Sequence, residues 1–445
     1  MDLLKATATI FPVFLFCTWL CLHKIHDANE APYIDEEFHV PQVQRFCNNN
    51  FEWDPKITTP PGLYFASIFT LKLLSFVKVG DFVCNLFDLR MTNSIFTCLN
   101  FIILTWIYSK KNKNLSSWVG VADILSLTTF PILYFFSFLY YTDVISTFTI
   151  LAMYCAYLHG KISISALFGF ISLWMRQTNV IWVAFVAAIY GYKILENLLT
   201  EEKLSIHKMS FFTAIIEGLR RPKLIISIIL KEIPYVMVGL SFVVFLLWNG
   251  SIVLGDKSAH QATIHLPQLF YYFLVCAAFS PALFLKHIPI FINFIKTNKI
   301  ATFFCLLSIA AVVHFNTMAH PYLLADNRHY AFYAWKRLFQ PTMMRFMFVP
   351  VYLFCASCML KNLSHQGAFF QILFVLCVAA SLVPQMLLEP RYFIIPFLMF
   401  KLNIPPEDSK SVCLNLLVSL FVNFVTIYVY IHCPFARESK IHFIW

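Results

Sequence analysis

The stretch VCLNLLVSLFVNFVTIYVYI, residues 412–431, contains no charged side chain over the length that an α-helix needs to cross the hydrocarbon layer of a membrane. A second apolar run, ATATIFPVFLFCTWLCL, covers residues 6–22, and similar runs recur along the 445-residue chain. Hydrophobic residues make up 59% of the sequence and charged residues only 13%, which is far more apolar than a water-soluble core requires. The pattern predicts an all-α polytopic membrane protein.

The apolar runs predict about 13 membrane-spanning helices. They cover residues 6–23, 91–109, 117–138, 144–158, 162–175, 178–192, 233–253, 267–285, 300–318, 346–360, 368–388, 391–402 and 412–432. The further apolar stretch 62–79 is interrupted by Lys72 and Lys78, so we expect it to lie as a helix on the membrane surface. The first run has no small-residue cleavage site behind it, which predicts an uncleaved span rather than a signal peptide.

Basic residues predict the orientation of these spans. They form short blocks beside the apolar runs, which explains the net charge of +10 without a nucleic-acid partner. With the surface helix in place, three basic blocks share one side: Lys110, Lys111 and Lys113; the 193–232 loop; and Lys286, Lys296 and Lys299. We therefore expect one membrane domain, residues 1–445, with a cytosolic amino terminus, a first lumenal loop at 24–90 and a cytosolic loop at 193–232.

Polar motifs gather on the opposite, lumenal side in this topology. They are DEEFH, YYTD, RQTN, GDKSAH, ADNRHY and EPRY. Unrelated loops would not be expected to pool acids, arginines and histidines on one face, whereas a site built from several helix ends would.

The stretch YIDEEFHVPQVQRF, residues 33–46, holds three consecutive acids in this nearly charge-free chain. Neighbouring side chains on a helix point in different directions, so only one or two of Asp35, Glu36 and Glu37 can face a common pocket. One of them can act as a general base, and the alternative is a solvated loop face. Polar and aromatic neighbours favour the site interpretation, although Trp53 could equally anchor the membrane interface. These neighbours are His39, Gln42, Trp53 and Asp54.

Cations at the ends of several predicted spans form a second candidate group. Each one alone could be an interface anchor or the partner of an adjacent acid, but together they could hold a lipid-linked phosphate. The group comprises Lys257, His260, Arg328, His329 and Arg391, and the adjacent acids are Asp256, Asp326 and Glu389. Arg176 lies between two apolar runs, where an unpaired charge is unfavourable, and Asp143 is its expected partner.

The 13 cysteines lie mostly inside apolar runs, where they are expected to be small buried hydrophobes rather than a metal or redox site. Cys47 and Cys84 share one polar region and could form a disulfide, but the sequence does not favour the pair over two free thiols.

With these motifs, the chain resembles the family of dolichyl-phosphate-glucose-dependent alpha-1,2-glucosyltransferases of the endoplasmic reticulum. The resemblance runs from residue 32 to about 403, and the closing IHFIW also fits. It is carried by DEEFHVPQ, WDPKITTPPGLY, LYFFSFLYYTD, RQTNVIW, GDKSAH, HPYLLADNRHYAFYAWKR and LLEPRYFIIP. Glu37 and Ala331 depart from the family pattern, and the extra acid leaves the choice of base between Asp35 and Glu36 open.

The resemblance implies a GT-C membrane fold and the transfer of glucose from dolichyl phosphate glucose to a diglucosylated dolichyl-pyrophosphate-linked oligosaccharide. This is the last alpha-1,2-glucose link before N-glycosylation of proteins. It implies Asp35 as the catalytic base, with Glu36 second, and a donor phosphate held by Lys257, Arg328 and Arg391. The expected substrate-binding residues are His39, Gln42, Trp53, Asp54, Asp143, His260, Asp326, Asn327 and His329. We expect no cofactor and no metal ligand, and the partners are the two lipid-linked sugars and membrane lipid.

Two alternatives remain at this point. A secondary transporter also has many spans and intramembrane charges, but it predicts charges near mid-membrane, broken helices and related halves. The other alternative is a dolichol-dependent mannosyltransferase of similar architecture, which is separated by supplying glucose and mannose donors in parallel.

Overall fold

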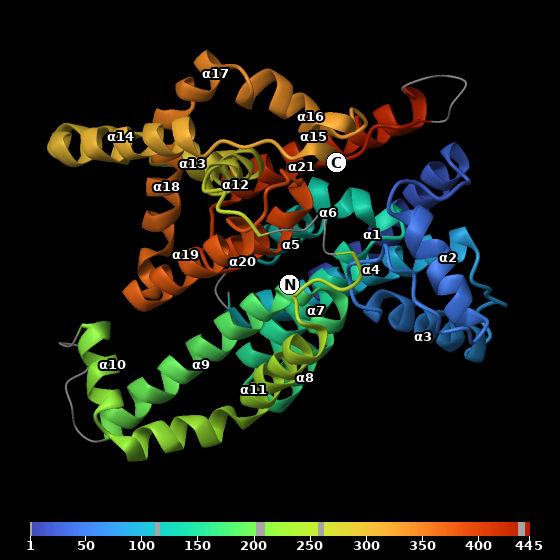
Figure 1. The fold of residues 1–445 in the computed structure, drawn as a ribbon, viewed down its shortest axis with the longest axis horizontal. Helices are drawn as coiled ribbons and strands as arrows, with labels where there is room; N and C mark the ends of the chain where they lie inside the picture. The colour runs from blue at the N-terminus through green and yellow to red at the C-terminus, as the bar shows by residue number, and fades with distance from the viewer. Residues whose placement is uncertain (1, 112–115, 202–209, 257–261, 435–440) are drawn as a thin grey trace.

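The computed structural model describes residues 2–111, 116–201, 210–256, 262–434 and 441–445. Within these ranges the chain forms helices, and its β contact is an isolated parallel bridge between His329 and Ile444. Figure 1 shows the helices of the middle of the chain (green) on one side and those of the carboxyl-terminal part (orange to red) on the other, with α2 and α3 (blue) together at one edge. The predicted all-α fold is confirmed for the described ranges.

Helices α1 (Leu3–Ala28) and α4 (Leu86–Lys111) pack against each other, and the first loop between them carries α2 (Glu36–Cys47) and α3 (Gly62–Phe76). The first turn of α3 lies against the end of α8 (Ile162–Met175). A β-carbon on Gly62 would lie 2.3 Å from the carbonyl oxygen of Trp174, so only glycine permits this approach. The first loop is thereby fixed to the helix ends that surround it.

A disulfide joins Cys47, at the end of α2, to Cys84, just before α4. The pair that the sequence left open is therefore formed. Disulfides persist in oxidising compartments and are rare in the cytosol.

Replacing both Cys47 and Cys84 by Ser is expected to lower the free energy of unfolding by about 3–4 kcal/mol, because the bond closes a loop over a sequence separation of 37. Thermal unfolding in detergent, with and without a reductant, measures this. Reductant should lower the unfolding temperature of the wild type and leave that of the double variant unchanged. An equal shift in both proteins would contradict a stabilising role for this bond.

In the middle of the chain, α7 (Thr142–Leu158) packs against both α4 and α8 (Ile162–Met175). Helices α9 and α11 run side by side, and α10 contacts both at their far end (Figure 1). The elements of this part are α5 (Ser117–Thr128), α6 (Pro131–Phe135), η1 (Phe136–Phe138), η2 (Gln177–Asn179), α9 (Val180–Glu201), α10 (Phe211–Leu219) and α11 (Pro222–Asn249).

The carboxyl-terminal part ends with α21 (Ser409–His432), which begins where the Asp408 carboxylate accepts a hydrogen bond from the Ser411 N–H and is about 36 Å long. Its polar Asn423 faces inward and donates to the Thr129 carbonyl at 2.6 Å, because lipid would offer no partner. The preceding elements are α12 (Pro267–Phe279), α13 (Pro281–Thr297), α14 (Lys299–Phe315), α15 (Pro321–Ala325), α16 (Tyr330–Ala334), η4 (Trp335–Phe339), α17 (Thr342–Met347), α18 (Val349–Leu363), η5 (Ser364–Gln366), α19 (Ala368–Leu382), η6 (Pro390–Phe393) and α20 (Ile394–Leu402).

Six helical stretches in the described chain are long and apolar enough to cross a membrane, and up to eight if two bent pairs each count as one span. Shorter apolar helices, among them α7, α8, α14 and α19, occupy the places of other predicted spans. The structure therefore confirms a polytopic helical protein, and the count of about 13 spans stays a prediction.

Three predicted segments differ in shape from the expectation. The predicted span 117–138 is bent by 60° between α5 and α6. The segment 193–232 is not a simple loop, because α9 continues to Glu201 and α11 already begins at Pro222, with α10 between them. Hydropathy marks where apolar side chains end, whereas a helix can continue while long charged side chains reach toward water. The predicted span 267–285 is also broken, since α12 and α13 meet at an angle of 109° around Ser280. Pro281 cannot donate a backbone hydrogen bond to the preceding turn.

Contacts between connecting segments sort them into two ends of the molecule. At one end, here called the site end, Asp35 contacts Arg391, and the Leu254 N–H donates to the Thr58 carbonyl. At the other, the basic end, Lys111 donates to Asn403 at 2.8 Å and Lys286 pairs with Asp408. This grouping agrees with the predicted separation of polar motifs from basic blocks, and the side of the membrane on which each end lies stays a prediction.

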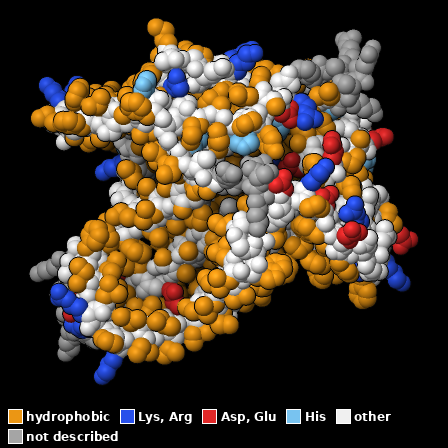
Figure 2. All heavy atoms as spheres, viewed as in Figure 1, with side chains coloured by type: hydrophobic (Ala, Val, Ile, Leu, Met, Phe, Trp, Pro, Cys, Tyr) orange, Lys and Arg blue, Asp and Glu red, His pale blue; other side chains and the backbone are white. Residues whose placement is uncertain are grey.

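Figure 2 shows one face of the molecule, on which hydrophobic side chains cover much of the surface. Charged side chains concentrate over the first-loop helices on one side and at the tips of α10 and α14 on the other. Soluble monomers rarely expose apolar surface on this scale, and a hydrocarbon environment accounts for it.

Candidate active site

The site end is organised around Asp35, which precedes the first residue of α2. The Asp35 N–H donates to the hydroxyl of Tyr141 at 3.2 Å, and that hydroxyl donates to the Tyr33 carbonyl at 3.2 Å. Ile34, between them, has a φ of +55°, a left-handed conformation that a β-branched residue rarely adopts. Such strain, on the order of 1–3 kcal/mol, persists only where the surrounding contacts determine the backbone. The chain therefore fixes the direction of Asp35 firmly.

Arg391, from the loop segment η6, is the main partner of Asp35. Its Nη1 lies 2.8 Å from Asp35 Oδ2 and 3.7 Å from Asp143 Oδ2, while its Nε donates to Glu389 at 3.0 Å. The guanidinium also lies over the ring of Tyr141, at 5.1 Å from its centroid. The Arg391 side chain is 14% exposed and that of Asp35 is 36% exposed. Asp35 is thus the group of this pair that a substrate can reach more readily.

Asp143 and Arg176 form the inner side of the cluster. Arg176 pairs with Asp143 Oδ1 at 3.0 Å and donates from Nε to the Thr142 hydroxyl at 3.0 Å, so the predicted Arg176–Asp143 pair is confirmed. Asp143 Oδ2 has no hydrogen-bond partner among the described residues, although the side chain is only 2% exposed. This oxygen remains able to accept a hydrogen bond from a hydroxyl group.

The electrostatics of the cluster keep Asp35 ionised. Burial alone raises the pKa of its carboxyl, but Arg391 and His39, with a smaller contribution from His329, outweigh burial and hold the pKa below its ordinary value. Burial lowers the pKa of His39 to about 4, and the attraction of Asp35 opposes this only in part. Two cations and three carboxylates therefore share a confined volume around an accessible oxygen.

Replacing Arg391 by Gln is expected to move the acid limb of the pH–rate profile to higher pH. The cation favours the ionised form of Asp35, so its removal leaves burial to raise the pKa of that carboxyl. The profile is measured as initial rate from pH 8 to below pH 4, because the wild-type limb lies below the ordinary pKa of a carboxyl, and the position of the limb, rather than its height, is compared. Arg45→Gln, which removes an exposed arginine from α2, is the matched control and should leave the limb in place. If the acid limb of Arg391→Gln lies at the same pH as that of the wild type, Arg391 does not lower the pKa of Asp35.

Glu36 was the second choice for the base, and its position argues for a structural role instead. The side chain is fully buried, and its Oε2 pairs with Arg90, also fully buried, at 2.6 Å. Its two oxygens also accept the backbone N–H groups of Tyr140 at 2.6 Å and Tyr33 at 3.0 Å. These contacts fill the acceptor positions of the carboxylate, so it joins α2, α4 and the segment before α7.

The remaining first-loop candidates are held by the protein. His39 Nδ1 lies 2.7 Å from the hydroxyl of Tyr64. Gln42 donates to the Glu52 carbonyl at 2.8 Å and accepts from the Asp54 N–H at 2.9 Å, so its amide shapes the loop after α2. Trp53 is half-buried against Phe46 and Tyr64. His39 thus lies nearest to Asp35, and the other three support the loop around it.

Arg328 and its neighbours lie at the same end. Arg328 pairs with Asp326 at 2.8 Å, and its guanidinium lies over the ring of Tyr33 at 5.7 Å. His329 Nε2 lies 3.5 Å from Asp326, and Asn327 is exposed. Arg328 therefore lies over a tyrosine that is two residues before Asp35 in the sequence.

Lys257 and His260 lie outside the described residues. The segment that leads to them is anchored on the first loop, because the Asp256 N–H donates to the Pro55 carbonyl at 2.8 Å. Gly255, with a φ of +59°, lies so close to that carbonyl that a β-carbon would overlap it.

Sequence reasoning missed Arg90, Tyr33 and Tyr141. Arg90 is a lone arginine at the start of an apolar run, which is itself a signal of a buried ion pair. The two tyrosines belong to the motifs YIDEEFH and YYTD. Nothing in their sequence context shows that the Tyr141 hydroxyl bridges the Asp35 N–H and the Tyr33 carbonyl. Within the described ranges, no group of three or more His, Cys, Asp or Glu side chains is arranged to hold a metal ion.

The helices and this cluster define a polytopic membrane protein with an ionised carboxylate centre at one end. The chain belongs to the DIE2/ALG10 family, whose model matches residues 29–402. It is 39% identical, over 97% of both chains, to a protein of Mus musculus named Dol-P-Glc:Glc(2)Man(9)GlcNAc(2)-PP-Dol alpha-1,2-glucosyltransferase. Proteins with the same name are 38% identical in Homo sapiens, over 97% of both chains, and 36% identical in Drosophila melanogaster, over 89% of both. No solved structure matches the chain.

Proposed function

We propose that this protein transfers glucose from dolichyl phosphate glucose to the 2-hydroxyl of the terminal glucose on a diglucosylated dolichyl-pyrophosphate-linked oligosaccharide. The names of the relatives, over nearly their whole length, support the donor and the acceptor. The observation that carries the proposal is the accessible, ionised Asp35 carboxylate beside Arg391.

In the proposed reaction, Asp35 removes the proton of the acceptor 2-hydroxyl while that oxygen bonds to the anomeric carbon of the donor. The bond between that carbon and the phosphate oxygen breaks with its electron pair, and dolichyl phosphate leaves. A single displacement inverts the β-linked donor to an α-linked product. A phosphate leaving group needs no general acid.

Arg391 interacts in turn with two negative charges in this step, the Asp35 carboxylate and the leaving phosphate. Before reaction it balances the Asp35 carboxylate. Once Asp35 has taken the proton, that negative charge is gone, and the guanidinium can stabilise the charge that develops on the leaving phosphate. Arg328 and Lys257 are assigned to the phosphate as well, while Asp143 Oδ2 is positioned to accept from a sugar hydroxyl.

We assign the remaining expected substrate contacts to three parts of the chain: the first loop with His39, Gln42, Trp53 and Asp54; His260; and the 326–329 segment with Asp326, Asn327 and His329. We propose a GT-C architecture of about 13 spans in one domain, residues 1–445, with the site end in the lumen of the endoplasmic reticulum and the amino terminus in the cytosol. The Cys47–Cys84 disulfide and the basic residues at the opposite end support this orientation.

The direct test reconstitutes the purified protein with dolichyl phosphate glucose and the diglucosylated acceptor. Addition of one hexose in an alpha-1,2 linkage is expected with this donor and not with dolichyl phosphate mannose. Transfer from the mannose donor would assign a mannosyltransferase instead. Uptake of a sugar by counterflow without any transfer would assign a transporter.

Arg328→Ala is expected to reduce the rate of transfer by about 10- to 100-fold at a fixed low donor concentration, because one phosphate donor is lost. Arg337→Ala removes an exposed arginine from the same stretch of chain and should leave the rate near that of the wild type. Rates are measured in membranes at equal protein content. An intact rate in Arg328→Ala would remove this residue from phosphate stabilisation.

A further inference from the structure

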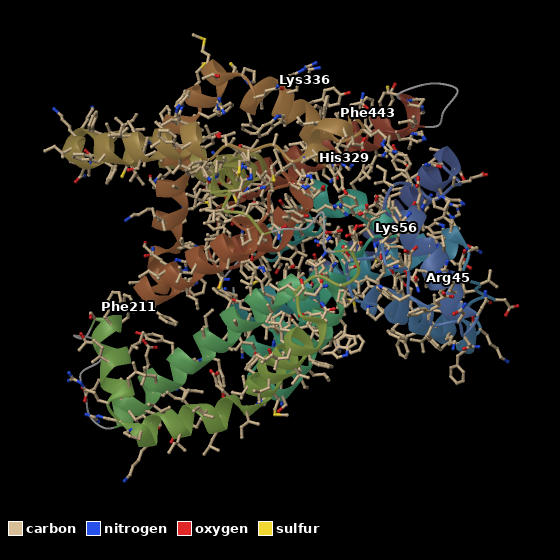
Figure 3. All side chains as sticks on the ribbon, viewed as in Figure 1. Arg45, Lys56, Phe211, His329, Lys336 and Phe443 are labelled. Carbon is tan, nitrogen blue, oxygen red and sulfur yellow. A yellow bond between two sulfur atoms is a disulfide. The ribbon has the colours of Figure 1, made fainter. Side chains whose placement is uncertain are left out.

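Residues 441–445, here called the strap, return to the site end and bind the segment that carries Arg328. The Ile444 N–H donates to the Arg328 carbonyl at 3.0 Å, and the Tyr330 N–H donates to the Ile444 carbonyl at 2.9 Å. The Ile444 side chain is fully buried. Figure 3 labels His329 and Phe443, which lie next to each other where the two segments meet.

Side chains extend this contact on both sides of the bridge. His329 Nδ1 lies 3.0 Å from the Trp445 carbonyl oxygen, which accepts a hydrogen bond when that nitrogen is protonated. The rings of Tyr330 and Phe443 stack with centroids 6.2 Å apart. The strap therefore binds Arg328 through its backbone carbonyl and His329 through its ring. These are the residues that we assign to the donor phosphate and its surroundings.

The other edge of the strap binds Tyr33. The His442 N–H donates to the Tyr33 hydroxyl at 2.9 Å, and the hydroxyl in turn donates to the His442 carbonyl. The His442 ring is buried and stacks on Tyr430 of α21 at 4.5 Å, so the strap is also fixed to a long helix. One tyrosine hydroxyl thus satisfies both backbone groups of a strap residue.

Tyr33 connects the strap to the residues around Asp35. Its N–H donates to Glu36, its carbonyl accepts from Tyr141, and its ring lies beneath Arg328. The next residue has the left-handed backbone that aims Asp35. A displacement of the strap would therefore move Arg328 and loosen Asp35 through the same side chain.

We propose that the strap is a positioning element of the active site, with Ile444 and Tyr33 as its positioning residues. It sets the distance between the phosphate-binding segment 326–329 and the base. The proposal rests on the proposed function. It predicts an effect on the donor, because the strap binds the segment assigned to the donor phosphate, and a smaller effect on the acceptor.

Ile444→Pro tests the bridge, because it removes the N–H that donates to Arg328. Ile444→Val is the matched control, because it keeps this N–H and most of the buried side chain. We expect Ile444→Pro to raise the KM for dolichyl phosphate glucose about tenfold, and Ile444→Val to change it by less than twofold. The KM for the acceptor should stay within twofold in both. A general loss of stability would lower the active fraction and so kcat, without selecting one substrate.

Tyr33→Phe removes the shared hydroxyl and keeps the ring beneath Arg328. It should raise the donor KM several-fold and increase amide hydrogen exchange in residues 326–332 of the full-length protein in detergent. An unchanged donor KM in both Ile444→Pro and Tyr33→Phe would overturn the proposal, as would unchanged exchange in Tyr33→Phe. If the wild type transfers no glucose, the proposed function fails, and the exchange result then decides separately whether the strap orders the segment.

Discussion

Replacing Asp35 by Asn is expected to lower kcat for glucosyl transfer by about 1,000-fold, within the range that a general base contributes. The amide oxygen can still accept a hydrogen bond from Arg391, so the local geometry should persist. The amide cannot take the proton of the acceptor hydroxyl. Initial rates with saturating donor and acceptor, together with unfolding temperatures, separate this loss of chemistry from a loss of folded protein.

Glu37 offers the matched control for Asp35. It carries the same charge two residues along the chain and is exposed. Glu37→Gln should keep a rate within about twofold of the wild type, since water screens its exposed carboxylate, although it lies near Arg328. A near-normal rate in Asp35→Asn would show that another group is the base.

Glu36→Gln is expected to act on folding, with a loss of about 3–5 kcal/mol in the free energy of unfolding. Arg90 has no exposed surface, and its guanidinium depends on the Glu36 carboxylate for its compensating charge. A neutral amide leaves that cation buried without a counter-charge. The expected result is low yield and a lowered unfolding temperature, measured in detergent, while the correctly folded fraction retains a kcat close to that of the wild type.

A second substitution tests this account of Glu36. Replacing the pair together, as Glu36→Gln with Arg90→Met, removes the uncompensated charge and should recover part of the stability lost in Glu36→Gln alone. If instead Glu36→Gln is as stable as the wild type and loses its activity, the structural assignment of Glu36 is wrong.

The adjacent residues Asp35 and Glu36 also mark the limit of sequence reasoning. The sequence predicts a polar site at one end of a helical membrane protein, because charges at the ends of apolar runs are visible locally. It also predicts the Arg176–Asp143 pair, since both residues are unfavourable alone in their surroundings. It does not distinguish the role of Asp35 from that of Glu36. The roles differ because Glu36 pairs with Arg90, which is 54 residues further along the chain.

The same reason explains the other differences. Hydropathy does not predict the bend of 109° at Ser280, because both halves of the pair are apolar. The strap has no regular pattern, and its role depends on hydrogen bonds to residues more than 100 positions earlier. Local composition therefore predicts which segments enter the membrane and which motifs share an end, while partners distant in sequence determine the role of each side chain.

The protein has an apolar surface and a carboxylate centre at one end (Figure 2). These two features determine how the lipid-linked donor and acceptor reach the site. Both proposed substrates carry long isoprenoid tails, so they diffuse laterally within the bilayer rather than through water. Their encounter with the enzyme depends on surface density, in molecules per unit of membrane area. Fusing empty phospholipid into active vesicles should therefore slow turnover, whereas diluting the same vesicles with buffer should leave the rate per vesicle unchanged.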